Sequence, residues 1–394
     1  MPVQFWIHGG AFVSGAGSLD WYNGKYFAHN EEIILVSINY RLGALGFLCH
    51  PEISGGNLGI QDQMLALEWV SQNIKSFGGD PDKITVMGQS AGAIFAFALL
   101  ANNKTRHLIK NVIFQNGRYD SFERPEIAFK KAEKFAKIAG LRVKQLASMP
   151  LEDMLDTQST LAQKEAAFAE TKIPFLPVID GDIIPIDTHA AALEGAIGKG
   201  VVPGTTQNEM HAFTSGQPEI EGASQKQIET VFRKEFKHDW ESTLKYCQQK
   251  IPAAAPMELL SQGLNLAHFE GQTTALAINF AKKGIKTWLY RFDWKSNQSL
   301  LGACHCIELP FLFNTFEQWA PPMTSGLELN EGLGLSKALQ KTWATFSRHR
   351  NPNHDGIPYW PKFSKTKQPE IHWNTQIEVM ANLTHNPLMS SQKI

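Results

Sequence analysis

The 394-residue sequence lacks the features that define several broad protein classes. Four cysteines are too few at this length for a disulfide framework, so we expect a reducing compartment and a cytoplasmic location. No apolar run is long enough to span a bilayer, and the first residues resemble a strand and not a secretory signal. The net charge of −1 argues against nucleic-acid and membrane partners, and no oligomeric state is predicted.

Sequence patterns for cofactors are missing as well. Neither a phosphate-binding loop nor a dinucleotide-binding glycine pattern occurs, so no organic cofactor is expected. The triplet Cys304-His305-Cys306 has no second cysteine–histidine pair near it, whereas zinc needs three or four ligands at suitable spacing. We therefore expect no metal. The composition that remains, 43% hydrophobic and 19% charged residues, is typical of a globular enzyme.

The most informative motif is Gly-Gln-Ser-Ala-Gly at 88–92. An apolar, β-branched run precedes it at 84–87, and a small-residue helical pattern follows at 93–101. A strand, a sharp turn and a helix in this order form the setting of a nucleophile elbow. Ser90 is expected at the turn, where the two glycines let strand and helix approach closely. The amide of Ala91, at the helix start, would then face a developing negative charge.

Strand and helix patterns alternate along the chain, which favours a mostly parallel sheet with helices on both faces. Strands are expected at 3–7, 33–40, 84–87, 111–115, 201–206 and 287–292. The run at 33–40 is too hydrophobic for a sheet with one exposed face, which suggests a central strand. Helices are expected at 60–77 and 335–349, and the segment after 349 looks irregular. We interpret 1–394 as a single domain with a helix-rich insertion or cap within about 125–283.

A serine nucleophile needs a base, usually a histidine that a carboxylate orients. In hydrolases of this architecture the acid and then the histidine follow the serine along the chain. Glu209 follows the strand at 201–206, and Asp293 follows the strand at 287–292, so both are candidates for the acid. His305 lies in a loop far downstream, with His211 and His268 as alternatives for the base.

The first strand ends in His8-Gly9-Gly10-Ala11-Phe12. Two glycines after a strand let backbone N–H groups approach a ligand closely. Together with the elbow, this predicts a loop that stabilises an oxyanion.

These and other motifs together resemble the type B carboxylesterases, the family of bacterial para-nitrobenzyl esterases, mammalian carboxylesterases and cholinesterases. The matching stretches run in family order along nearly the whole chain, at 6–12, 39–43, 56–63, 77–81, 88–92, 177–181, 208–209 and 305–311. The resemblance implies an α/β-hydrolase fold and a serine hydrolase that cleaves small carboxylic esters through an acyl-enzyme. It implies Ser90 as nucleophile, Glu209 as acid and His305 as base. It also implies that the oxyanion is held by the amides of Gly10, Ala11 and Ala91.

Three departures from the family pattern stand out. Family members carry a segment ahead of the His-Gly-Gly loop, so we expect the N-terminal strands to be missing and a sheet edge to be exposed. Gln89 replaces the usual Glu before the nucleophile, and Asn116 replaces the usual Ser after the next strand. We hypothesise that a hydrogen bond between these two amides replaces the charged pair.

The alternative functions are a catalytically inactive truncated remnant and a non-catalytic cholinesterase-like binding protein. The presence of Ser90, Glu209 and His305 argues against a dedicated binding role.

Overall fold

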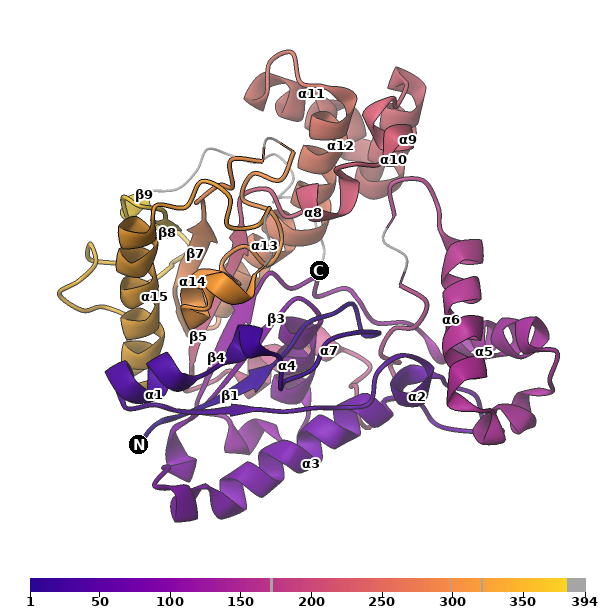
Figure 1. The fold of residues 1–394 in the computed structure, drawn as a ribbon, viewed down its shortest axis with the longest axis horizontal. Coiled ribbons are helices and arrows are strands. Elements are labelled where there is room, and N and C mark those ends of the chain that lie inside the picture. Colours follow the sequence, from indigo (N-terminus) through magenta and orange to yellow (C-terminus); the bar gives the residue numbers. More distant parts are fainter. Residues whose placement is uncertain (171–172, 299, 320–321, 381–394) are drawn as a thin grey trace.

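The computed structural model describes residues 1–170, 173–298, 300–319 and 322–380, so residues 171–172 of the expected cap segment lie outside it. Its strands are β1 (Val3–Ile7), β2 (Ile34–Ser37), β3 (Ile84–Gln89), β4 (Asn111–Gln115), β5 (Gly200–Thr206), β6 (Lys286–Thr287), β7 (Leu289–Phe292), β8 (Glu370–Trp373) and β9 (Glu378–Met380). They form one nine-stranded sheet in the order β2-β1-β3-β4-β5-β7-β8-β9, and β6 pairs with β5 (Figure 1). Every pair is parallel except β8 with β9, which confirms the expected mostly parallel sheet.

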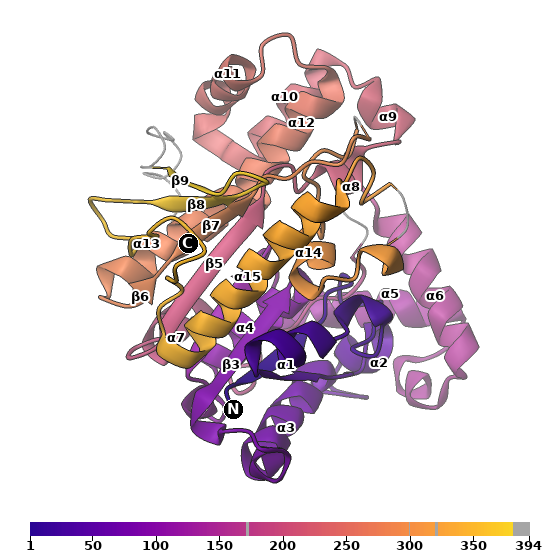
Figure 2. The same ribbon diagram turned by 60° about the vertical axis from the view of Figure 1, so that its left-hand side comes forward.

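Helices cover both faces of the sheet. One face packs against α3 (Leu58–Asn73), α4 (Ala91–Ala101), α7 (Thr188–Gly195) and α13 (Gly271–Lys282). The other packs against α1 (Lys25–Glu31), α14 (Leu309–Phe313) and α15 (Leu329–His349), which run in front of the strands in Figure 2. The sheet therefore separates two hydrophobic cores, as expected for a parallel sheet buried on both sides.

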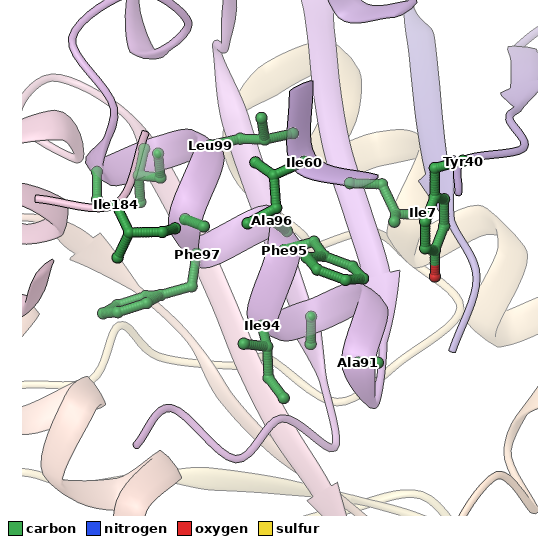
Figure 3. Close-up of a cluster of buried hydrophobic side chains, with 14 of the residues drawn as sticks. Ile7, Tyr40, Ile60, Ala91, Ile94, Phe95, Ala96, Phe97, Leu99 and Ile184 are labelled. Carbon is green, nitrogen blue, oxygen red and sulfur yellow. The ribbon is translucent and has the colours of Figure 1, made fainter. Parts of the chain in front are cut away.

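Side chains of β1 alternate between these two cores, as the period of a strand requires. Phe5 and Ile7 belong to the core around α4, whereas Trp6 belongs to the core around α15. Helix α4 itself is buried along its whole length, and Figure 3 shows Ile60 and Ile184 on opposite sides of it. A helix that is apolar all round must lie inside the protein, so the small-residue pattern after Ser90 places α4 against the sheet.

The remaining helices form two groups. Helices α2 (Gly43–Phe47), α5 (Pro125–Ala139) and α6 (Leu151–Glu165) extend the core around α4. The second group comprises α8 (His211–Thr214), α9 (Pro218–Glu221), α10 (Gln225–Phe236), α11 (Trp240–Lys250) and α12 (Pro256–Asn265). Helices α8 to α12 gather beyond the end of β5 (Figure 1) and share a separate hydrophobic core that includes Phe232 and Leu260. A π-helical turn, Leu266–Glu270, joins α12 to α13.

Two expectations about strands are wrong. The run at 33–40 was expected to be central, but β2 pairs only with β1 and forms one edge of the described sheet. Its residues are apolar because both faces are covered: Ile34 and Val36 contact one core and Leu35 the other. The segment after 349 was expected to be irregular, but it contains β8 and β9.

Candidate active site

Ser90 lies at the turn between β3 and α4, in the position expected of a nucleophile elbow. Its backbone has φ 57° and ψ −123°, a conformation that a non-glycine residue adopts only under constraint. The constraint includes the neighbouring strand, because the Ser90 amide donates to the Gln115 carbonyl at 2.8 Å. A Cβ on Gly92 would lie 2.0 Å from the Ile7 carbonyl oxygen, and one on Gly88 would lie 2.3 Å from the Gly92 oxygen. Both glycines are therefore required for the close approach of α4 to the sheet.

The loop after β1 lines the same cavity as Ser90. Gly10 and Ala11 have φ 124° and 52°, and Val13 and Ser14 both donate to the Gly10 carbonyl at 3.0 Å. That loop geometry turns the oxygen of Gly10 back into the loop. Within the described residues the amides of Gly10, Ala11 and Ala91 have no hydrogen-bond partner, and all three residues line the cavity. Free amides near a serine are the arrangement that stabilises an oxyanion.

Glu209 and His305 are in direct contact, although they are distant in sequence. Glu209 Oε2 lies 2.5 Å from His305 Nδ1, and Glu209 Oε1 accepts from the Thr206 amide at 2.8 Å. Glu209 is fully buried and His305 is 6% exposed. With both carboxylate oxygens occupied, the carboxylate fixes the orientation of the imidazole ring.

Two hydrogen bonds between Asn208 and Ala303 hold together the two loops that carry this pair. The Asn208 amide donates to the Ala303 carbonyl at 2.9 Å, and the Ala303 amide donates to Asn208 Oδ1 at 3.1 Å. The His305 ring also lies 5.2 Å from the ring of Phe213 and 5.3 Å from that of Phe269, between centroids. The acid and the base are therefore delivered by loops whose relative position is fixed.

The second ring nitrogen of His305 faces the elbow. Burial lowers the pKa of His305, but neighbouring Cys306 and Glu209 outweigh burial and raise the pKa well above its usual value. His305 Nε2 lies 3.2 Å from Gln89 Nε2, and no described hydrogen bond joins it to Ser90 Oγ, although both residues line the cavity. Catalytic hydrogen bonds are often incomplete before substrate binds.

The alternative acid and bases have other surroundings. Asp293 binds His372 and Arg291, each at 2.7 Å, and is not part of the cavity wall. His268 does line the cavity, but burial and then Arg118 lower its pKa to about 3. His211 is outside the cavity wall, and burial lowers its pKa. Of the three histidines, the structure brings only His305 into contact with Glu209.

The hypothesised hydrogen bond between Gln89 and Asn116 is wrong. Gln89 Nε2 lies near His305 Nε2 and donates to Cys306 Sγ at 3.2 Å. Asn116 Nδ2 instead donates to Glu308 Oε1 at 2.9 Å, and Asn116 Oδ1 has no partner among the described residues. The two amides serve different partners because Glu308, a carboxyl that the sequence analysis treated only as part of a motif, is buried beside Asn116.

Sequence reasoning also missed the rest of the cavity, which has a volume of about 450 Å³. Part of its wall is apolar, with contributions from Ile94, Met210, Phe213 and Phe269, and another part is charged, with contributions from Arg118, Lys234 and Glu235. The one signal for Glu308 was a single charged residue within the apolar stretch 307–313. The charged wall gave no local signal, because its residues come from separate segments.

Among the residues that the structure describes, no group of three or more His, Cys, Asp or Glu side chains is placed to hold a metal ion. No described helix has both the length and the apolar character needed to cross a membrane.

The parallel sheet, the serine elbow and the functional loops at the carboxyl ends of the strands define an α/β-hydrolase. The chain belongs to the carboxylesterase family, whose model matches residues 1–390. It is accordingly a carboxylic ester hydrolase.

Several characterised proteins are similar to this chain. The para-nitrobenzyl esterase of Bacillus subtilis is 32% identical over 391 residues, which cover 96% of this chain and 77% of that esterase. The phenmedipham hydrolase of Pseudarthrobacter oxydans is 30% identical, over 92% of this chain and 73% of that hydrolase. The solved structure of the Geobacillus stearothermophilus carboxylesterase EST55 at pH 6.2 matches with a TM-score of 0.87 and 30% identity, covering 97% of this chain and 80% of that structure.

Proposed function

We propose that the protein hydrolyses small carboxylic esters through an acyl-enzyme on Ser90, with His305 as general base and Glu209 as its orienting acid. The observation that carries this proposal is the 2.5 Å contact between Glu209 and His305 at the cavity that Ser90 lines. The strained turn at Ser90 supports it, since such turns expose a serine hydroxyl at the top of a sheet.

The reaction proceeds in two steps. His305 Nε2 takes the proton of Ser90 as the hydroxyl oxygen attacks the ester carbonyl, and the imidazolium then donates that proton to the departing alcohol. Water, activated by the same nitrogen, then cleaves the acyl-enzyme. Glu209 stabilises the imidazolium that forms, and its second oxygen is held in place by the Thr206 amide. Serine attack requires the Gln89 amide to yield its place beside Nε2.

The amides of Gly10, Ala11 and Ala91 receive the oxyanion of each tetrahedral intermediate. They are free of other partners in the described structure, so no hydrogen bond has to break when the charge develops. Loss of one such donor typically reduces kcat by about 10²–10³-fold.

The cavity favours a substrate with an apolar group next to the ester. Phe213 and Phe269 flank His305 and line the cavity, so an aromatic or aliphatic group would pack against their rings. The names of two similar proteins, a para-nitrobenzyl esterase and a phenmedipham hydrolase, indicate substrates that contain such groups. We further propose that 1–394 is one domain in which the helices within about 125–283 cap this cavity, since Met210, Phe213, Lys234 and Glu235 in its wall come from that segment.

The direct test is a rapid-mixing assay with para-nitrophenyl acetate. We expect a burst of nitrophenol equal to the enzyme concentration, and no burst with Ser90→Ala. Ser121→Ala is the matched control, because Ser121 is a buried serine in the same cavity wall that the proposed mechanism does not use.

A fluorophosphonate probe gives an independent readout. It should label the protein and fail to label Ser90→Ala. Absence of both burst and labelling in folded protein would favour the non-catalytic alternatives and refute the proposed mechanism.

A further inference from the structure

A second carboxyl lies buried behind the proposed catalytic pair. Glu308 comes three residues after His305, is 2% exposed and has no lysine or arginine in a described salt bridge with it. The titratable groups that interact with it come from several elements and are Glu209, His305, Cys304, Tyr22 and Tyr290. Only one of these, His305, can carry positive charge. A carboxylate there would therefore be poorly compensated.

The two oxygens of Glu308 have different surroundings. Oε1 accepts from Asn116 Nδ2 at 2.9 Å and from Gln115 Nε2 at 3.4 Å. Oε2 is buried with no partner, and so is Asn116 Oδ1. An ionised carboxylate needs donors at both oxygens, whereas a protonated one accepts at its carbonyl oxygen and needs an acceptor at its hydroxyl. The observed pattern is that of the protonated form.

We propose that Glu308 holds a proton in the resting enzyme and donates it from Oε2 to Asn116 Oδ1. With the existing bond from Asn116 Nδ2 to Oε1, this closes a two-point ring between a carboxylic acid and an amide. One proton then satisfies both buried oxygens that otherwise have no partner.

The electrostatics of the site agree with this geometry. Burial, and next the nearby charge of Glu209, raise the pKa of Glu308 to about 7. A neutral Glu308 leaves Glu209 as the one carboxylate in contact with His305 among the described residues. An ionised Glu308 would add a further negative charge, which would hold the proton on His305 more tightly and weaken it as a base near neutral pH.

Glu308 is thus a positioning residue that sets the charge around the base. This role rests on the proposed function, but the protonation state does not. Infrared spectroscopy tests it without turnover, because a protonated carboxyl absorbs apart from a carboxylate. We expect the wild type to show a protonated-carboxyl band at pH 6 that Glu308→Gln lacks, since Gln is a neutral isostere.

Asp293→Asn is the matched control, because Asp293 is a mostly buried carboxylate whose pKa lies at about 2. Burial alone would raise that pKa, but His372 and Arg291 outweigh burial. The control should keep the band. Identical spectra of the wild type and Glu308→Gln from pH 5 to pH 7 would overturn the proposal and show an ionised Glu308.

The pH profile of kcat/KM provides the second readout. Glu308→Gln should leave the acid limb within about 0.3 pH unit of the wild type, because it removes no charge. Asn116→Asp adds an acid that must share one proton with Glu308. The apparent pKa of the acid limb should therefore rise by about 0.5 unit or more, which is about a threefold loss of kcat/KM on the acid side. A fall of about 0.5 unit in Glu308→Gln would show that the wild-type carboxyl is charged and would overturn the proposal.

Failure of the proposed function is distinguishable from failure of this inference. If the wild type shows the infrared band but no esterase activity, and Glu308→Gln lacks the band, the acid–amide ring is supported and the proposed mechanism is refuted. If the wild type is an active esterase but shows no such band, the mechanism is supported and the ring is refuted.

Discussion

Replacing His372 with Asn should remove a buried charge pair that links strands β7 and β8. His372 Nδ1 lies 2.7 Å from Asp293 Oδ2, and Arg291 binds both oxygens of the same carboxylate at 2.7 and 3.0 Å. The other His372 nitrogen is 3.2 Å from a Glu370 oxygen, although the two atoms are poorly aligned for a hydrogen bond. His372 is 5% exposed, so water screens these contacts weakly.

The size of the effect follows from the pKa of the imidazole. Burial lowers the pKa of His372, but Asp293 and then Glu370 outweigh burial and raise it from 6.5 to about 9. The difference of about 2.5 units, at 1.36 kcal/mol per unit, corresponds to about 3 kcal/mol of stability. The lowered pKa of Asp293 arises from the same interaction with His372, so its stabilisation is not added to this estimate.

The sign of the pH dependence is fixed by the raised pKa. A group with a higher pKa in the folded state stabilises the fold fully below pH 6.5 and loses that contribution as pH rises through 9. Urea unfolding should therefore show a gap between wild type and His372→Asn that is about 3 kcal/mol larger at pH 6 than at pH 9.5. His354→Asn is the control, because burial lowers the pKa of His354 and no such decrease is expected. A gap for His372→Asn that is equal at both pH values would refute a charged His372.

Three further substitutions test the site and the elbow. Glu209→Gln should reduce kcat by about 10³-fold or more, because it removes the charge that orients the base. Asp293→Asn should leave kcat/KM within about threefold of the wild type in the same steady-state assay. The reverse result would show that Asp293, and not Glu209, is the acid. Gly92→Ala should prevent native folding, measured by circular dichroism and soluble yield, because its Cβ would lie 2.0 Å from a backbone oxygen of β1. Gln89→Glu should lower activity near pH 7, because a carboxylate 3.2 Å from the base nitrogen raises the pKa of His305; an unchanged pH profile would contradict this.

The parts of the fold that local sequence determines could be predicted. The elbow depends on two glycines and a serine within five residues, so its geometry is set by neighbours in sequence. Strands β1, β3, β4 and β5 follow from short apolar runs that end in turn residues. The parallel sheet follows from their alternation with helices.

The wrong expectations concern features that depend on distant partners. An apolar run such as the one in β2 indicates that both faces of the strand are covered. It does not indicate whether a second strand pairs with each edge, and β2 pairs only with β1 in the described sheet. Strand β8 escaped recognition because it has only four residues, too few for its alternation of polar and apolar residues to stand out. Its polar residues are nevertheless buried: His372 lies against Asp293 from outside the strand, and Glu370 lies near His372. A polar residue that is buried in an ion pair has the sequence pattern of an exposed one.

The catalytic residues lie between these two cases. Ser90 is identified by its own motif, but the choice of Glu209 and His305 over their alternatives rested on family resemblance and not on local pattern. The structure shows why local pattern was insufficient: the acid and base loops meet through Asn208 and Ala303, which are 95 residues apart. Such a contact has no local sequence signal.

The two amide substitutions now have distinct physical roles. Gln89 places a neutral amide beside the base nitrogen where the family usually has a carboxyl, so it adds no negative charge that would raise the pKa of His305 further. Asn116 serves the buried Glu308, for which an amide offers a donor and an acceptor on two separate atoms. A serine hydroxyl carries both functions on one oxygen and cannot form the same two-point ring. Both changes act in the same direction, because Gln89 replaces a carboxyl beside His305 and Asn116 favours the protonated form of Glu308.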